Sequence, residues 1–82
     1  MSNVVPLSSL SARTAGTIAE IQPGVIAPKL VEMGLYPGCF VRVLFKAPFG
    51  GPLAVDLGSS VLSLRIDEAD CVLLSNESLT SE

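Results

Sequence analysis

The sequence predicts a mainly β fold: a small barrel of about five short strands with one short helix between the first two strands. Short segments of alternating apolar residues recur along the chain, and this alternation is the period of a half-buried strand. Glycine- and proline-rich segments separate them, as expected of turns. The chain has 82 residues, of which 49% are hydrophobic. Because a domain of this size buries only about 60–65% of the surface that its unfolded chain exposes, it needs this dense apolar content for a stable core.

The first predicted strand covers residues 16–21, and a short helix follows it. The regular helix is expected to begin near Ala27 or Pro28 and to end at Met33, because a helix accepts proline only in its first turn. Spacing of i, i+4, i+7 predicts the stripe of the helix that faces the core. The residues of this stripe are Ile26, Leu30 and Met33.

A turn and a long strand come after the helix. Gly34 stands where the left-handed cap of a helix favours glycine, and Pro37-Gly38 suits the centre of a type II turn. Residues 39–46 are rich in aromatic and β-branched residues and contain no breaker, so they predict a strand. Its expected core-facing residues are Val41, Val43 and Phe45. Phe40 and Leu44 on the other face predict that this face is partly covered as well.

The second half of the chain predicts three more strands, over residues 53–57, 60–66 and 71–74. Alternation of apolar and polar residues identifies the inward face of the first two. The expected inward residues are Leu53, Val55, Leu57, Leu62, Leu64 and Ile66. Residues 67–70, between the last two strands, suit a short 3-10 turn with Asp67 as its cap.

One domain is expected over residues 7–74, between a flexible N-terminus (1–6) and a polar, disordered C-terminal tail (75–82). The first residues have neither the basic start nor the long apolar run of a secretory signal. Nowhere does the sequence approach the roughly 20 apolar residues of a membrane span. We therefore expect a cytoplasmic protein that is not inserted in a membrane.

The charge distribution argues against a nucleic-acid partner. The chain has five basic and eight acidic residues, and two of the acids, Glu77 and Glu82, lie in the predicted tail. Residues 1–74 therefore carry five positive and six negative charges, without the basic stripe that nucleic acids attract. Cys39 and Cys71 stand among apolar residues, which predicts small, at least half-buried side chains rather than a disulfide.

Catalysis and metal binding find little support in the sequence. There is no histidine, the commonest general base and a common metal ligand. The serines lie in capping and tail segments without a base to activate them. Asp67, Glu68 and Asp70 offer oxygen ligands for a hard cation, but the favoured interpretation is a capped turn whose carboxylates face water. We expect no enzyme, no cofactor and no metal site.

Two surfaces are candidate contact sites for a protein partner. In the loop 47–52, Phe49 stands between Pro48 and Gly50. Either this ring is an exposed anchor for a partner, or it folds back as a lid over an open end of the barrel; both interpretations remain open. The second candidate surface, at the end of the helix and in the turn after it, consists of Lys29, Glu32, Leu35 and Tyr36. A solvated tyrosine at a turn is the alternative there.

A string of residues between Leu30 and Pro52 carries a family resemblance. It reads Leu30-x-Glu32-Met33-Gly34-Leu35-x-Pro37-Gly38, then Val41-x-Val43, then Ala47-Pro48-Phe49-Gly50-x-Pro52. This pattern resembles the FeoA family, and a weaker likeness extends it to nearly the whole chain from Leu7 to Leu74. The resemblance implies an SH3-like barrel and a small cytosolic accessory protein of bacterial ferrous iron uptake.

What the resemblance implies about partners is a docking role. It implies contact with the cytosolic side of FeoB, the membrane permease that carries a GTPase domain, through the Phe49 loop and the surface around Leu35 and Tyr36. A second hypothesis is a metal-responsive regulatory domain, similar to the C-terminal SH3-like module of iron-dependent repressors. A third is a homo-oligomer formed through exposed strand edges. In one respect the chain departs from the family: where arginines are usual in the helix, only Lys29 is basic.

Overall fold

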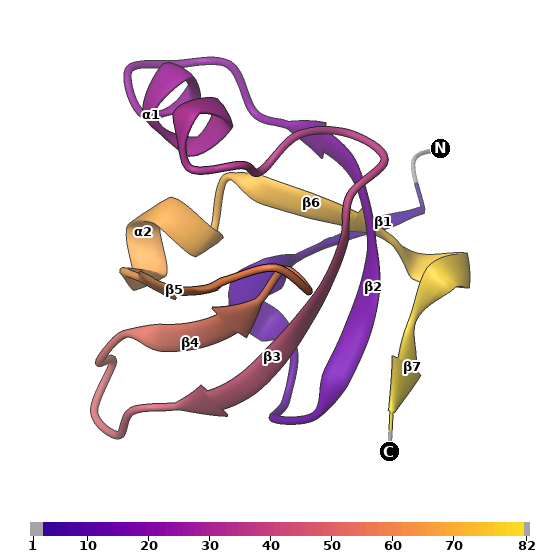
Figure 1. Cartoon of the computed structure of the whole chain (residues 1–82), viewed down its shortest axis with the longest axis vertical. Coiled ribbons are helices and arrows are strands. Elements are labelled where there is room, and N and C mark those ends of the chain that lie inside the picture. The colour runs from indigo at the N-terminus through magenta and orange to yellow at the C-terminus, as the bar shows by residue number, and fades with distance from the viewer. Residues whose placement is uncertain (1–2, 82) are drawn as a thin grey trace.

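Seven strands, all paired antiparallel, form one curved sheet in residues 3–81, the part of the chain that this computed structural model describes (Figure 1). Two short helices and two 3-10 turns connect them. In chain order the elements are β1 (Val4–Pro6), η1 (Leu7–Ser9), β2 (Thr14–Ile21), α1 (Ala27–Glu32), β3 (Phe40–Lys46), β4 (Leu53–Asp56), β5 (Val61–Leu64), α2 (Ile66–Ala69), β6 (Val72–Ser75), η2 (Asn76–Ser78) and β7 (Thr80–Ser81).

The long strand β2 joins the two halves of the sheet. The strand order is β1-β6-β2-β3-β4-β5, and β7 pairs with β2 outside this path. β2 pairs with β3 through Ala15–Thr17 and with β6 through residues 18–21, with a register shift between Ile18 and Glu20. Such an irregularity increases local twist and lets one strand take part in both halves of a barrel. The predicted fold class, mainly β and SH3-like with a short helix, is confirmed. The sheet has seven strands where about five were predicted, and α1 lies between β2 and β3 rather than between the first two strands.

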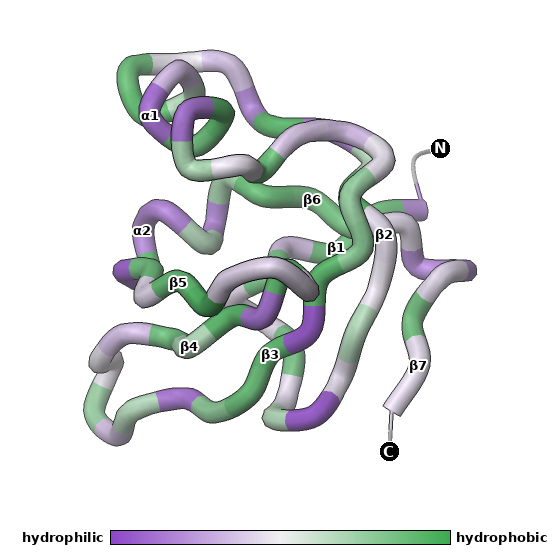
Figure 2. The backbone as a smooth tube through the Cα atoms, viewed as in Figure 1, coloured by the Kyte–Doolittle hydropathy of each residue, from purple (hydrophilic) through white to green (hydrophobic). Residues whose placement is uncertain are grey.

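The core is aliphatic. The large side chains with less than 2% exposure are Leu7, Ile18, Leu30, Leu35, Leu53, Leu64, Leu74, Val41, Val43, Val55 and Val72. Hydrophobic residues run along β6, whereas α2 combines hydrophobic and hydrophilic residues (Figure 2). All three phenylalanines of the chain, Phe40, Phe45 and Phe49, are more than half exposed. The aromatic rings are therefore available for contacts outside the core.

Helix α1 and the turn after it follow the local sequence closely. Proline occupies the first turn, Met33 caps the C-terminal end, and Gly34 has φ +98°. The Leu35 N–H donates to the Leu30 carbonyl at 3.0 Å, which brings the chain back toward the core. Gly38 also has φ +98°, and the Cys39 N–H donates to the carbonyl of Tyr36 at 3.1 Å. The predicted helix and the predicted type II turn are both confirmed.

The prediction for the second half of β3 is wrong, because the strand contains an irregularity at Leu44. Val43 pairs with Val55 but Phe45 pairs with Ala54, so one extra residue stands on β3. A slip of one residue moves the following side chains to the opposite face of a sheet. Phe45, expected in the core, is therefore exposed. Lys46 is exposed as well, and its ammonium donates to the Ser8 carbonyl at 2.9 Å.

The other face of β3 is partly exposed and partly covered, as predicted. Phe40 is 52% and Leu44 38% exposed, and Arg42 between them is half-buried. The expectation of a partly covered face rested on these two apolar residues. Arg42 and Lys46, which alternate with them in the sequence, were the signal for a face in contact with water.

The segment predicted as a 3-10 turn is one turn of α-helix, α2, and its cap differs from the prediction. The Glu68 carboxylate reaches back and accepts the N–H of Arg65, the N-cap residue, at 2.9 Å. The side chain of Asp67, the expected cap, accepts the N–H of its neighbour Glu68 at 3.0 Å instead of capping the helix. A glutamate at the third helical position is long enough to satisfy the N-cap donor, whereas an aspartate at the second is not placed to do so.

Both ends of the chain are more ordered than the predicted boundaries 7–74 imply. Strand β1, within the supposedly flexible residues 1–6, pairs with β6, while residues 1–2 lie outside the described part. The expectation of a disordered segment 75–82 is wrong for residues 75–81, which form the end of β6, η2 and β7; Glu82 is not described. The anchor is Leu79, which packs against the core. One apolar residue in a polar segment has no periodicity from which a strand could be predicted.

Candidate functional site

The loop between β3 and β4 holds Phe49 in full contact with solvent. Its relative exposure is 104%, and its φ of +60° lies in the left-handed region, uncommon for a residue with a side chain. Two backbone bonds close the loop, from the Ala47 N–H to the Pro52 carbonyl at 2.9 Å and from the Gly51 N–H to the Pro48 carbonyl at 3.2 Å. The ring does not cover the barrel, so the lid interpretation is wrong.

The neighbours of Phe49 in this loop are also at the surface. Pro48 and Gly50 are exposed. A Cβ atom on Gly51 would lie 2.7 Å from the Cβ of Ala47, which shows how tightly the loop is closed. The result is an apolar ring on a short, constrained loop at one end of the molecule (Figure 1).

Only part of the second predicted surface is exposed. Tyr36 is 52% exposed, but Leu35 is completely buried and belongs to the core, so it cannot serve as a contact residue. The thiol of Cys39 beside Tyr36 raises the pKa of the tyrosine, first through a hydrogen bond. Tyr36 borders a hollow of about 360 Å³ whose lining includes Glu32 and Ser59.

The two predicted surfaces do not form one contact face. Helix α1 and the turn after it lie at one end of the molecule, and the β3–β4 loop lies at the other (Figure 1). A single docking face that combines Phe49 with Tyr36 was an expectation from sequence alone, and the tertiary structure separates the two residues. Phe49 and Tyr36 are therefore two distinct candidate sites.

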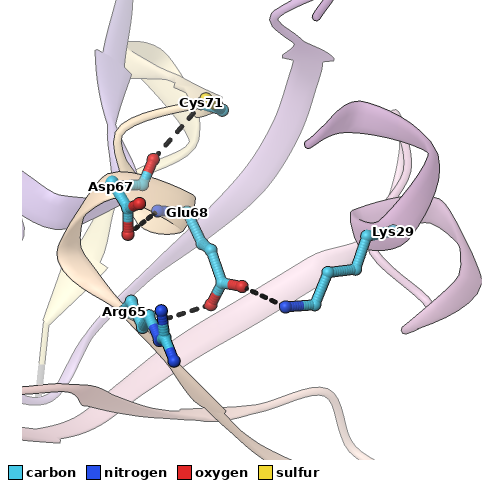
Figure 3. Close-up of polar contacts among 5 residues, drawn as sticks. All are labelled: Lys29, Arg65, Asp67, Glu68 and Cys71. Atoms are coloured by element: carbon cyan, nitrogen blue, oxygen red, sulfur yellow. Dashed lines mark hydrogen bonds and ion pairs between the residues drawn. The ribbon is translucent and has the colours of Figure 1, made fainter. Parts of the chain in front are cut away.

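The Lys29 side chain has a structural contact. Its ammonium lies 2.7 Å from Oε2 of Glu68, so this pair links α1 to α2 (Figure 3). The Glu68 side chain is only 7% exposed, whereas that of Lys29 is 62% exposed. The hydrogen bond from Lys29, followed by the one from the Arg65 N–H, lowers the pKa of Glu68. Glu68 is therefore a buried, paired carboxylate, and the prediction that it faces water is wrong.

The acidic residues on either side of Glu68 also take part in hydrogen bonds. Asp70, just after α2, accepts one from the Ser8 hydroxyl. The backbone carbonyl of Asp67 accepts one from the Cys71 thiol at 3.5 Å (Figure 3). Cys39 and Cys71 are both free thiols. Within residues 3–81, no group of three or more histidine, cysteine, aspartate or glutamate side chains is arranged to hold a metal ion.

Phe40, Phe45 and Val61 are surface residues that sequence reasoning did not place among the candidate contacts. For Phe40 a signal existed, because it shares its predicted face with arginine and lysine. The exposure of Phe45 depends on the irregularity at Leu44, for which the sequence has no marker.

Among residues 3–81, no helix has the length and apolar character needed to cross a bilayer.

The architecture defines a small SH3-like domain with exposed apolar side chains. A family model described as the FeoA domain matches residues 5–76, and the chain belongs to the FeoA family. This family is linked to ferrous iron transport, and the family resemblance predicted from the sequence is confirmed. No curated protein matches the chain.

Solved structures of FeoA proteins have the same fold. The FeoA of Stenotrophomonas maltophilia, solved with zinc and described as a prokaryotic SH3 domain protein, is 33% identical, with a TM-score of 0.83 over 94% of this chain and 96% of that one. Another FeoA, described as an iron uptake regulatory protein, is 33% identical, with a TM-score of 0.79 over 88% of this chain and 96% of that one. A FeoA-like protein of Clostridium acetobutylicum is 27% identical, with a TM-score of 0.82 over 99% and 90%.

The likeness extends to a domain of larger regulators. A manganese-dependent transcriptional repressor aligns with a TM-score of 0.82 over 92% of this chain and 42% of the repressor chain, at 19% identity. At that level of identity the comparison shows a shared fold and nothing about shared ligands.

Proposed function

We propose that this chain is a non-enzymatic, cytosolic accessory protein of ferrous iron uptake that docks on the cytosolic side of a FeoB-type permease and its GTPase domain. Membership of the FeoA family supports the link to iron uptake. Full exposure of Phe49 on a closed loop is the observation that carries the docking role. A chain without histidine, whose buried carboxylate is already paired, offers little for acid–base catalysis.

The loop geometry suits a hot-spot residue. Complete burial of a phenylalanine ring stabilises a complex by about 1.5–3 kcal/mol, and aromatic anchors of this kind dominate many interfaces. The two backbone bonds across the loop constrain the backbone that carries the ring before a partner arrives. Since less conformational entropy is then lost on binding, more of the burial energy contributes to affinity.

Docking alone would suffice to influence the permease. A protein that binds one conformation of a partner more tightly than another shifts the population toward that conformation. The accessory protein then needs no chemistry of its own, and its effect on GTP hydrolysis or gating follows from which permease conformation it prefers.

The test is binding of the purified FeoB cytosolic domain from the same genome, measured by biolayer interferometry. Phe49→Ala should weaken binding by about 10- to 100-fold, the equivalent of the burial energy of the ring. The matched control is Phe40→Ala, which removes an exposed phenylalanine from β3 outside the loop and should leave the affinity unchanged. Circular dichroism verifies that both variants are folded.

The proposal is rejected if the wild-type chain does not bind at micromolar concentrations. Equal binding by wild type and Phe49→Ala would keep the partner but remove the loop from the interface. Tyr36→Ala would then be the next variant to measure, because Tyr36 is the exposed aromatic residue at the other end of the molecule.

A further inference from the structure

The hollow of about 360 Å³ beside Tyr36 is lined by three segments that are far apart in the sequence. Glu32 belongs to the end of α1, Tyr36 and Phe40 to the turn and the start of β3, and Ser59 and Ser60 to the turn between β4 and β5. The volume is at the lower end of the range for ligand pockets, about 300–1,000 Å³. The hollow is therefore large enough for one long side chain.

Backbone hydrogen bonds hold two of these segments in place. The Gly38 N–H donates to the Ile18 carbonyl at 2.8 Å, and the Ile18 N–H donates to the Cys39 carbonyl at the same distance. The turn before β3 is thus fixed against β2. The turn after β4 is closed by a bond of 2.8 Å from the Leu57 N–H to the Ser60 carbonyl. The backbone around the hollow is therefore already constrained without a ligand.

Two aromatic residues line the same hollow. Tyr36 and Phe40 are each 52% exposed, and neither belongs to the core. The face of an aromatic ring is electron-rich and attracts a cation placed over it. Both rings are therefore available to a cationic group.

The charge in the hollow is negative. Among the described residues that line it, Glu32 is the only charged one. Its carboxylate is exposed and makes no hydrogen bond or ion pair within residues 3–81. The carboxylate is therefore free to bind a cation from outside the chain.

The basic residues nearest in sequence have partners elsewhere. Arg42, two positions after Phe40, donates to the Arg13 carbonyl at 3.0 Å, and the Lys29 ammonium pairs with Glu68. Neither of these two basic side chains lines the hollow. The charge of Glu32 is therefore not neutralised from within the lining.

We propose that this hollow binds an arginine side chain of a protein partner. The planar guanidinium stacks on the rings of Tyr36 and Phe40, and its N–H groups donate to the Glu32 carboxylate. Arginine suits such a site better than lysine, because its flat group both stacks on aromatic faces and donates two parallel hydrogen bonds to a carboxylate. The hydroxyl oxygens of Ser59 and Ser60 are further acceptors in the lining.

A protein partner fits the hollow better than a free small molecule. Ligand pockets enclose about 70–90% of a small ligand, whereas both aromatic residues here remain half exposed. Val31, next to Glu32 on α1, is also 50% exposed and adds apolar surface that a larger partner would cover. The site is separate from the Phe49 loop, and it requires neither the permease nor any other part of the proposed function.

Other occupants lack support in the lining. An anion would meet the Glu32 carboxylate and no basic side chain among the described lining residues. A bare metal ion would lack ligands, since residues 3–81 contain no suitable group of three side chains. A second copy of the chain would carry the same net charge of −3 and be repelled.

The experiment uses the full chain and a panel of five-residue peptides with a central arginine between alanine, valine or serine residues. One matched panel has citrulline, which has the shape of arginine but a neutral urea group, and another has lysine. Binding is measured by chemical-shift changes in two-dimensional NMR spectra. Arginine peptides should shift residues 32–40 and 57–60, more weakly as salt is raised. Citrulline peptides should bind about tenfold more weakly or not at all, and lysine peptides more weakly than arginine peptides.

Two substitutions test the assigned contacts. Glu32→Gln should weaken arginine binding about three- to tenfold, because it removes the charge but keeps the shape. Its matched control is Glu20→Gln, at an exposed carboxylate on β2. Phe40→Ala should weaken binding about two- to fivefold through the lost cation–π contact. Its control is Phe45→Ala, at an exposed ring of β3 outside this hollow. Neither control should have an effect, and circular dichroism verifies that all four variants are folded.

Several results would overturn the inference. These are no binding by any arginine peptide in the millimolar range, equal binding by the citrulline or lysine panel, shifts that map elsewhere, or an equal loss in a substitution and its control. Binding of free N-acetylarginine amide as tight as that of the peptides would assign the hollow to a small molecule. Self-association in light scattering that Glu32→Gln abolishes would assign it to a second copy. Each of the last two results also overturns the inference.

Discussion

Removing the charge of Glu68 tests how α1 is held against the rest of the fold. Glu68→Gln keeps the size and shape of the side chain, and its amide oxygen can still accept the Arg65 N–H, now 2.9 Å from Oε1. What is lost is the charge-assisted bond at 2.7 Å from the Lys29 ammonium to Oε2. The variant therefore isolates the ionic part of the contact between α1 and α2.

The expected loss is about 1 kcal/mol of unfolding free energy at neutral pH. Hydrogen bonds to charged groups stabilise by about 1.5–3 kcal/mol and neutral ones by about 0.5–1.5 kcal/mol, a difference of about 1–1.5 kcal/mol. We take the lower end because the Lys29 side chain is 62% exposed and solvent weakens the interaction. For a domain of this size the loss corresponds to a fall in Tm of about 4–8 °C.

The effect must also depend on pH in a definite direction. The pKa of folded Glu68 is lowered, mainly by the hydrogen bond from Lys29, relative to an unfolded value of about 4.3. The wild-type chain therefore has the full stabilisation above about pH 4.3 and loses it as the pH falls through the lower folded pKa. Glutamine does not titrate, so the stability difference between wild type and Glu68→Gln should shrink in that acidic range.

Urea unfolding followed by circular dichroism, repeated at several pH values between neutral and about pH 3, measures both quantities. Glu32→Gln is the control for net charge, since Glu32 is an exposed carboxylate on α1. An equal loss in this control, or a Glu68→Gln difference that stays constant down to the lowest pH, would show that the reasoning about the Lys29–Glu68 pair is wrong.

Three further substitutions test the packing of the chain. Gly16→Ala should destabilise by about 1–3 kcal/mol and loosen residues 76–81 in hydrogen exchange, because the new Cβ would lie 2.7 Å from Leu79 Cδ2 and 2.9 Å from Leu74 Cδ2; unchanged exchange there would contradict this. Leu35→Ala should cost about 2–5 kcal/mol in urea unfolding, while Tyr36→Ala, at the next position but exposed, should change stability by less than about 0.5 kcal/mol. Similar losses in the last two would argue against the burial of Leu35.

Local chemistry made much of the fold predictable. Three local signals predicted α1 and the turn after it: proline in the first helical turn, glycine at the left-handed positions 34 and 38, and aliphatic residues at helical spacing. Each signal can be recognised from residues only a few positions apart. Alternation likewise identified Leu53 and Val55 as buried residues of β4. The residues from Leu30 to Pro52 also predicted the family, because this one stretch specifies the helix, the turn and the strand together.

The candidate site was predictable only in part. The exposure of Phe49 could be stated as one of two alternatives, because the sequence shows a constrained loop but not what lies beneath it. Leu35 and Tyr36 are adjacent, yet one is in the core and the other faces water. That difference depends on where the type II turn directs the chain relative to the rest of the barrel.

The sequence by itself determined the helix, the turns, most of the strands and the aliphatic core, because these depend on local backbone preferences and on the period of apolar residues. Only the tertiary structure decided the outward position of Phe45, the pairing of residues 80–81 with β2, and the separation of Phe49 from Tyr36. Each of these depends on contacts between segments far apart in the chain. Strand register and the anchoring of a polar segment by one leucine are set by such contacts, and no local pattern specifies them.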